Sequence, residues 1–269
     1  MPLVYDSPHS GRHYPADFGS ALPAAVLRQA EDAYVDELIA DAPDVGVATL
    51  CALFPRAYID PNRTEDDIDP ALLAEPWPQP LSPGEKTRLG ISLIRRVVTP
   101  DRPIYARKLA AAEIEHRIAR YHRPYLEALD RLVHDAHARH GRVWHLHWHS
   151  MKPRGNASTP DGPGARRADF VLGDLHGTAC APELTATVQT FLEAHGHRVA
   201  LNRPYAGAAI LHRLAAPAQG IHCLQIEINR ALYLDATTVA KSRGFESLRT
   251  TIHALTRHLA RPSTGTSVG

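Results

Sequence analysis

The distribution of apolar side chains along this 269-residue chain is the feature that most constrains its fold. Short apolar runs of strand length alternate with segments whose apolar residues recur at helical spacing. Strands that alternate with helices favour a mostly parallel sheet with helices on both of its faces. We therefore predict an α/β fold in three layers, α/β/α, around a mostly parallel mixed sheet, in a single domain over residues 1–261.

The pattern also predicts where each element lies. Strands are predicted at residues 3–6, 46–53, 57–59, 142–148, 170–172, 198–201 and 221–228. Helices are predicted at residues 23–40, 105–140, 181–195 and 237–259. Pro124 could kink or divide the second of these helices. Proline and glycine predict a loop-rich insertion at 66–83 and a mobile active-site loop at 153–167, and small polar residues predict a disordered tail at 262–269.

Composition excludes several classes of function. Thirty basic and 29 acidic side chains nearly cancel, which argues against broad electrostatic binding to nucleic acid or to anionic membranes. No apolar stretch is long enough to span a bilayer, and residues 1–6 do not resemble a signal peptide. Three widely spaced cysteines form neither a disulfide framework nor a metal knuckle. We therefore expect a cytoplasmic protein that acts on a small molecule, with its oligomeric state left open.

Polar residues that suit a metal site follow two of the predicted strands. His9 follows the first strand and His149 follows the fourth, where open α/β sheets place their ligand sites. A catalytic zinc ion takes three protein ligands, so these two histidines need a third, which Asp32 or Asp36 of the first helix could supply. His147 shares a strand face with His149, as an alternative ligand or as the partner that orients it. Zinc suits this set best, although other divalent transition metals could replace it.

A carboxylate in an apolar run is the clearest candidate for a general base. Glu227 interrupts the strand at 221–228, where burial would raise its pKa toward the range used in acid–base catalysis. The alternative is a structural ion pair with Arg230 or another arginine. We predict that Ser150 and Arg230 contact the ligand side chains rather than the ion.

Basic residues near two other strand ends could bind an acidic substrate. Asn62 and Arg63 could clamp a carboxylate, since arginine offers a planar pair of donors, but Arg63 could instead pair with an acid among residues 65–67. Arg166 and Arg167 could bind a second acid group or could be a solvated pair. Tyr205 could donate to the oxyanion, cover the substrate, or pack in the core.

Seven stretches, in order over roughly residues 3–236, resemble the N-formylglutamate amidohydrolase family, which is related to zinc carboxypeptidases and aspartoacylases. They lie at residues 7–11, 31–35, 58–63, 149–151, 169–173, 202–207 and 225–233. The resemblance implies a phosphorylase/hydrolase-like fold. The chain departs from the family pattern at His147, where aspartate is common, at Pro61, where leucine is usual, and at Ala208, which replaces a glycine.

The resemblance also implies a role for each matching residue. His9 and His149 become zinc ligands, and the acidic ligand falls on Asp32. Glu227 becomes the general base, while Asn62 and Arg63 hold the substrate carboxylate. The expected reaction is hydrolysis of an N-formyl or other small N-acyl amino acid, such as N-formylglutamate to formate and glutamate. A different zinc N-acyl amino acid deacylase, a small peptidase, or a non-catalytic metal- or ligand-binding relative are the alternatives.

Overall fold

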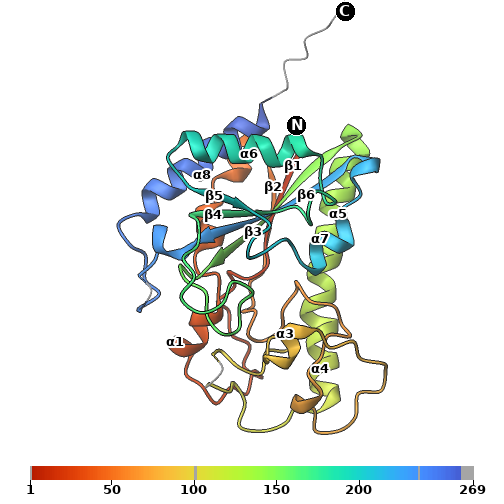
Figure 1. The fold of residues 1–269 in the computed structure, drawn as a ribbon. Coiled ribbons are helices and arrows are strands. Elements are labelled where there is room, and N and C mark those ends of the chain that lie inside the picture. The colour runs from red at the N-terminus through yellow and green to blue at the C-terminus, as the bar shows by residue number, and fades with distance from the viewer. Residues whose placement is uncertain (1, 100–101, 236, 262–269) are drawn as a thin grey trace, which may run out of the picture.

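A six-stranded sheet crosses the computed structural model, which describes residues 2–99, 102–235 and 237–261 (Figure 1). Its strands are β1 (Leu3–Ser7), β2 (Ala48–Cys51), β3 (Val143–Met151), β4 (Phe170–Gly173), β5 (Val199–Leu201) and β6 (Ile221–Asn229). The spatial order is β2-β1-β3-β6-β4-β5. Only the β4–β6 pair is antiparallel among these strands. The predicted mostly parallel mixed sheet is confirmed.

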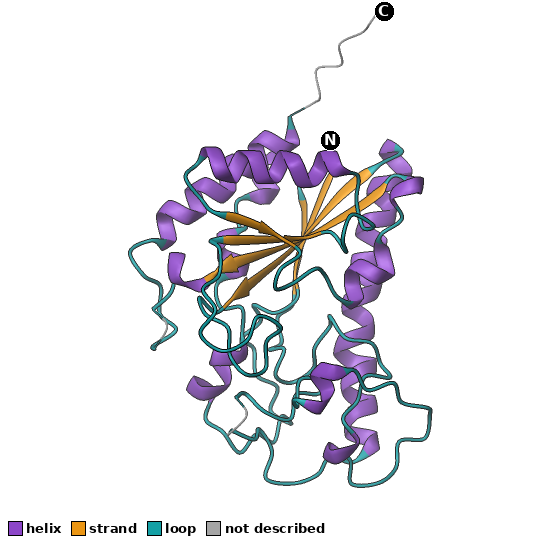
Figure 2. Ribbon diagram, in the orientation of Figure 1, coloured by secondary structure: helices purple, strands orange, loops and turns teal. Residues whose placement is uncertain are grey.

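Helices cover both faces of this sheet (Figure 2). They are α1 (Ala24–Leu27), α2 (Val35–Leu38), α3 (Glu85–Arg88), α4 (Ala111–Arg117), α5 (Arg123–His140), α6 (Pro182–Ala194), α7 (Ala209–Leu214) and α8 (Phe245–Ala260). One apolar core joins the sheet to α4, α5 and α7. A second core joins the opposite face to α2, α6 and α8. The three-layer α/β/α prediction is therefore confirmed.

Strand β3 shows why the sequence pattern is informative here. All nine of its residues are buried, as expected for a parallel strand covered on both faces. Trp144, Leu146 and Trp148 pack into the core formed with α2, α6 and α8. The histidines of β3 alternate with them and face the other side. The predicted division of this strand into an apolar face and a histidine face is confirmed.

The predicted helix at residues 23–40 is wrong as one continuous element. A short α1 continues as a 3₁₀ turn at Arg28–Ala30, and α2 begins only at Val35. Tyr34 at the break has a left-handed backbone with φ of 62°, which a continuous α-helix does not allow. In the gap, the Asp32 backbone N–H donates to the carbonyl of His9 at 2.9 Å. The long-range contact therefore replaces a helical hydrogen bond and fixes Asp32 beside the turn after β1.

Three other boundaries also differ from the prediction. Residues 57–59 form a turn rather than a strand, because their apolar side chains are buried in the core as part of a loop. The helix predicted at 105–140 begins at Ala111, and a π-helical turn at Ile118–His122 separates α4 from α5 just before Pro124. The last helix begins at Phe245 rather than at 237, because Asp235 accepts hydrogen bonds from two following backbone N–H groups and holds a turn there. Helices α3 and α7 were not predicted.

Residues 52–99 and 102–110 lie in the lower part of the molecule in Figure 1, below the carboxyl ends of the central strands. This part is rich in loops, as predicted for 66–83, and contains a 3₁₀ turn at Pro70–Leu72 and the short α3. The predicted tail at 262–269 lies outside the described residues. Among the helices of the described part, none is long and apolar enough to cross a membrane.

Candidate active site

Three neighbouring strands carry the central residues of the site at or just after their carboxyl ends. His9 follows β1, His149 lies near the end of β3, and Glu227 lies near the end of β6. β3 stands between β1 and β6, and its His149 is in register with Glu227. The parallel alignment of these strands therefore brings residues from three distant parts of the chain to one edge of the sheet.

His9, Asp32 and His149 form a buried cluster in which one side-chain atom of each converges on the others. The Nδ1 atoms of the two histidines are 3.0 Å apart, and Asp32 Oδ2 lies 3.0 Å from His149 Nδ1 and 3.3 Å from His9 Nδ1. Ligand atoms around a tetrahedral zinc ion are roughly 3.3 Å apart, so these three atoms suit one face of such a site. Two imidazoles and a carboxylate are also suitable donors, and the set can hold a metal ion. Asp36 lies outside this cluster.

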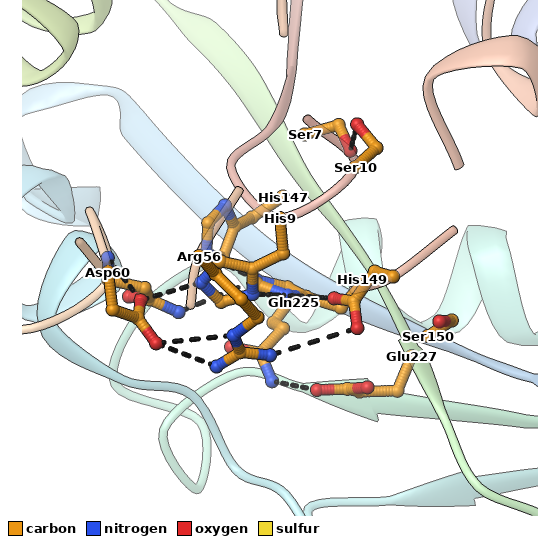
Figure 3. A network of polar contacts seen from close by, with 12 residues as sticks. Ser7, His9, Ser10, Arg56, Asp60, His147, His149, Ser150, Gln225 and Glu227 are labelled. Atoms are coloured by element: carbon orange, nitrogen blue, oxygen red, sulfur yellow. Dashed lines mark hydrogen bonds and ion pairs between the residues drawn. The ribbon is translucent and has the colours of Figure 1, made fainter. Parts of the chain in front are cut away.

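Three further groups hold the cluster in place. Asp60 Oδ1 lies 2.6 Å from Nε2 of His9, and Arg230 donates from Nη2 to Asp32 Oδ1 at 2.9 Å. Arg56 donates to Asp60 Oδ2 at 2.8 Å and lies 3.7 Å from Asp32 Oδ1 (Figure 3). Burial alone would raise the pKa of both acids. Hydrogen bonds with His149 and His9, and then the charge of Arg56, hold the pKa of Asp32 well below its usual value, and the charges of Arg56 and His9 do the same for Asp60. Carboxylates in such contacts fix the ring orientation of a ligating histidine.

A second chain of contacts leads from His149 into the protein interior. His147 Nε2 is 2.6 Å from His149 Nε2, and His147 Nδ1 is 2.7 Å from Asp6 Oδ1. His145 and the Tyr125 hydroxyl also bind Asp6, at 2.7 and 2.8 Å. Burial alone would raise the pKa of Asp6, but the histidine contacts outweigh it and hold the pKa below its usual value. His147 is not one of the three residues whose ligand atoms converge around His9, and it lies between His149 and Asp6.

Glu227 is 8% exposed and does not form the ion pair with Arg230 that was the structural alternative. Arg230 instead binds Asp32 and donates from Nε to the Ser150 hydroxyl at 3.0 Å. The amide nitrogen of Gln225 donates to Glu227 Oε1 at 3.0 Å (Figure 3). Burial first, and then the negative charge of Asp32, raise the pKa of Glu227 to about 8. Such a shift toward neutral pH is typical of carboxylates that transfer protons in catalysis.

These groups open into a cavity of about 190 Å³ between residues 86–99 and residues 152–167. Ligand pockets commonly measure roughly 300–1,000 Å³, so this cavity suits a small molecule better than a peptide. Among the described residues, seven basic side chains line it, whereas Asp32 and Glu227 are its acidic ones. The basic residues are Arg56, Arg63, Lys86, Arg95, Lys152, Arg167 and Arg230. The excess of positive charge favours an anionic ligand.

The predicted substrate-binding residues are mostly found at this cavity. Asn62, Arg63, Arg167 and Tyr205 line it. Arg63 also donates to Asp67 Oδ2 at 3.2 Å, so the alternative pairing predicted for it occurs as well. The Asn62 side-chain oxygen accepts the backbone N–H of Ile210 at 3.0 Å, which fixes the amide.

Arg166, also predicted to bind substrate, is not part of the cavity lining. Arg166 lies in an isolated antiparallel bridge with Arg154, and neighbouring side chains in extended backbone point to opposite sides. Arg167 therefore faces the cavity while Arg166 does not. There, Arg167 forms two hydrogen bonds to Asp161, at 2.8 and 2.9 Å, and its guanidinium lies 5.1 Å from the centre of the Tyr205 ring.

Several residues of the site were not singled out from the sequence. Asp60 belongs to the stretch at 58–63 but received no role, and its place two residues before Asn62 is the signal that could have found it. Asp6 ends the apolar run of β1 in the same way that Glu227 interrupts β6. Arg56 and Arg95 lie in loops without a recognisable motif, so their place at the cavity depends on the tertiary structure.

Comparison with known proteins gives consistent results. The family model for N-formylglutamate amidohydrolase matches residues 1–234. An N-formylglutamate deformylase of Pseudomonas aeruginosa is 29% identical over 252 residues, which cover 87% of this chain and 83% of that protein. An N-formylglutamate deformylase of Pseudomonas putida is 26% identical over 245 residues, covering 88% and 83% of the two chains.

Solved structures show the same likeness. The crystal structure of N-formylglutamate amidohydrolase from Ralstonia eutropha JMP134 superposes with a TM-score of 0.91 at 48% identity, covering 97% of this chain and 93% of that one. A gene product of Agrobacterium tumefaciens has the same fold, with a TM-score of 0.66 at 18% identity and coverage of 96% and 87%.

Proposed function

The chain belongs to the N-formylglutamate amidohydrolase family, and from this premise we propose that it hydrolyses the formyl amide of N-formyl-L-glutamate to formate and glutamate. One observation carries the proposal. The converging atoms of His9, Asp32 and His149 lie in the same small, basic cavity as the buried Glu227. A metal-ligand set, a proton-transfer group and a surplus of cations are what hydrolysis of an anionic amide requires.

In this proposal the three converging residues hold a zinc ion. When bound, the ion would supply Lewis acidity, which activates water and polarises the amide carbonyl. Asp60 keeps the His9 ring oriented through its contact with Nε2, and His147 does the same for His149 through the contact between their Nε2 atoms. The hydrogen bond from Arg230 to Asp32 leaves Oδ2 of that carboxylate free to face the histidines.

Glu227 carries the proton in this mechanism. Its carboxylate accepts a proton from the attacking water as the hydroxyl oxygen bonds to the formyl carbon, and then gives it to the amide nitrogen as the carbon–nitrogen bond breaks. Gln225 holds Oε1 by a hydrogen bond during both transfers. A nearby cation would favour the ionised form of Glu227 and so lower its pKa below the value of about 8 set by burial and by Asp32.

The remaining cavity residues orient the substrate and stabilise charge. Asn62 and Arg63 are proposed to bind the α-carboxylate, since both side chains are held by neighbours and line the cavity. Burial raises the pKa of Tyr205 to about 12, so its hydroxyl keeps its proton at neutral pH and can donate to the developing oxyanion. Arg167, stacked on the Tyr205 ring, holds that ring in place.

Formate release from N-formyl-L-glutamate tests the proposal. Chelator-stripped protein is expected to be inactive and to regain activity with added zinc. Glu227→Gln should lower kcat by at least about 100-fold while zinc still binds, because it removes the proton acceptor but keeps the shape of the side chain. Glu193→Gln, a matched change on the surface of α6, should leave the rate unchanged.

The comparison substrate is N-acetyl-L-glutamate. The small cavity predicts that the acetyl compound is a poorer substrate than the formyl one. Failure of the zinc-loaded, folded protein to release formate would overturn the proposed reaction, and full activity of Glu227→Gln would overturn the assigned role of this residue.

A further inference from the structure

Arg95 is a buried cation without a partner in the described part of the chain. It is 7% exposed, lines the cavity of the proposed active site, and has no hydrogen bond to its Nε atom. The next residue provides a contrast, since Arg96 binds the Asp69 carboxylate at 2.7 Å and does not line the cavity. Of the two adjacent arginines, the structure therefore pairs one with an acid and places the other in the cavity lining.

The backbone before Arg95 is firmly held. The carbonyl of Leu93 accepts the backbone N–H of Asp60 at 2.9 Å, and the N–H of Leu93 donates to the carbonyl of Asp67 at 2.8 Å. Leu93 and Ile94 are fully buried in the apolar core. The position of Arg95 is thus fixed relative to Asp60, which itself contacts His9. A side chain on such a rigid backbone can distinguish between ligands of different shape, because its starting position does not adapt to each of them.

Leaving a guanidinium buried and unpaired is costly. Burial first, and then the charge of Arg56, lower the pKa of Arg95 to about 9, which still leaves the side chain charged at neutral pH. An anion in the cavity would relieve this cost, because it would supply the missing acceptor and the missing opposite charge. Arg56, Arg63, Arg167 and Arg230 already have carboxylate partners within the protein, so Arg95 is the buried arginine of the cavity that still needs one.

Lys152 is another cation of the cavity lining that has no carboxylate partner among the described residues. It lines the cavity and forms no ion pair with any described residue. Lys86 also lines the cavity without an ion pair to a described residue, but its ammonium lies 5.6 Å from the centre of the Tyr205 ring. Arg95 and Lys152 therefore both line the cavity without a carboxylate partner among the described residues.

We propose that Arg95, assisted by Lys152, binds the side-chain carboxylate of the substrate and thereby selects N-formyl derivatives of acidic amino acids. The inference rests on the proposed function and names the residues that decide its substrate class. A substrate with two carboxylates would use Asn62 and Arg63 for the first and Arg95 for the second. The neutral amide of N-formyl-L-glutamine would leave the charge of Arg95 without compensation.

Steady-state kinetics of zinc-loaded protein with N-formyl-L-glutamate and N-formyl-L-glutamine test this subsite. The wild type is expected to prefer the glutamate compound. Arg95→Met should lower kcat/KM for it by about 100-fold, mostly through KM, since truncating one partner of a buried charge pair has effects of this order. It should change kcat/KM for the glutamine compound by less than about threefold, so that the preference disappears. Arg96→Met is the matched control and should keep the preference for the glutamate compound.

Equal losses on both substrates would overturn the inference, because they would assign Arg95 to the α-carboxylate or to general stability. An unchanged preference in Arg95→Met would overturn it as well.

Binding measurements separate this inference from the proposed reaction. By calorimetry, the zinc-loaded wild type should bind glutarate at least about tenfold more tightly than butyrate, and Arg95→Met should bind the two equally. Glutarate preference that depends on Arg95, in a protein that releases no formate, would support the subsite and reject the deformylase reaction. Formate release without any glutarate preference would support the reaction and reject the subsite.

Discussion

At the scale of single residues, the site consists of paired groups in which one side chain fixes another. Asp60 holds His9, Arg230 holds Asp32, and His147 holds His149. The family commonly has aspartate at the position of His147, and here the carboxylate of Asp6 is reached through that imidazole at 2.7 Å. The departure from the family pattern therefore keeps a carboxylate in the chain of contacts but moves it one side chain further from His149.

Asp60→Asn tests this support of the proposed ligands. The variant keeps the side-chain shape but loses the charge that orients the His9 ring, and zinc affinity is expected to fall about 10–100-fold. Competition with a chromophoric chelator measures this affinity. Asp69→Asn changes another buried acid that binds Arg96 outside the cavity, and it should leave zinc affinity unaltered. Equal affinities of Asp60→Asn and the wild type would contradict the orienting role.

At the scale of elements, the turn after β1 has to pass very close to the loop after β2. A Cβ atom on Gly11 would lie 2.2 Å from the carbonyl oxygen of Phe54 and 2.6 Å from the carbonyl carbon of Leu53. Only glycine allows this approach, because backbone atoms cannot move aside as a flexible side chain can. Gly11 is therefore required for a structural reason, because it lets the turn that bears His9 pack against the loop after β2.

Gly11→Ala should therefore destabilise the protein and disturb the site together. We expect the free energy of unfolding to fall by about 1–3 kcal/mol, typical of overpacking, and zinc affinity to fall with it. Denaturant unfolding and chelator competition measure the two effects. Gly84→Ala is the control, since a Cβ there meets nothing within 4 Å, and it should cost less than about 1 kcal/mol. A stable Gly11→Ala protein with normal zinc affinity would show that the turn can move.

At the scale of the whole molecule, the proposed metal site depends on the complete fold. His9 and His149 are 140 positions apart in the chain, and Asp32 is 117 positions from His149. Their ligand atoms meet only when β1, β3 and the break before α2 are all in place. An ion that binds this arrangement and not the unfolded chain stabilises the native state in proportion to its affinity.

Removal of zinc should consequently lower the melting temperature. At a free zinc concentration of about 100 times Kd the gain is about 2.7 kcal/mol, which for a chain of this size corresponds to roughly 5–10 °C. Thermal unfolding with zinc and with excess chelator measures the difference. His149→Ala should abolish it, whereas His134→Ala, an exposed histidine of α5, should preserve it. Equal melting temperatures of the wild type with zinc and with chelator would argue against a bound ion.

The sequence by itself determined the class of fold and the edge of the sheet where the site lies. Hydrophobic periodicity is a local property, and β3 displays it in full, with Trp144, Leu146 and Trp148 on one face and histidines on the other. The positions of His9, His149 and Glu227 at strand ends followed from the same pattern, because parallel strands share one carboxyl edge.

The tertiary structure decided which side chains meet at that edge. Helical spacing predicted one helix over residues 23–40, and only the contact between Asp32 and the His9 carbonyl, with the break at Tyr34, separates Asp32 from Asp36. Arg56 and Arg95 lie in loops whose paths depend on long-range packing and hydrogen bonds rather than on local preference. That packing determines which side chains from distant segments come together. Periodicity along the chain does not predict it, because periodicity reflects only local structure.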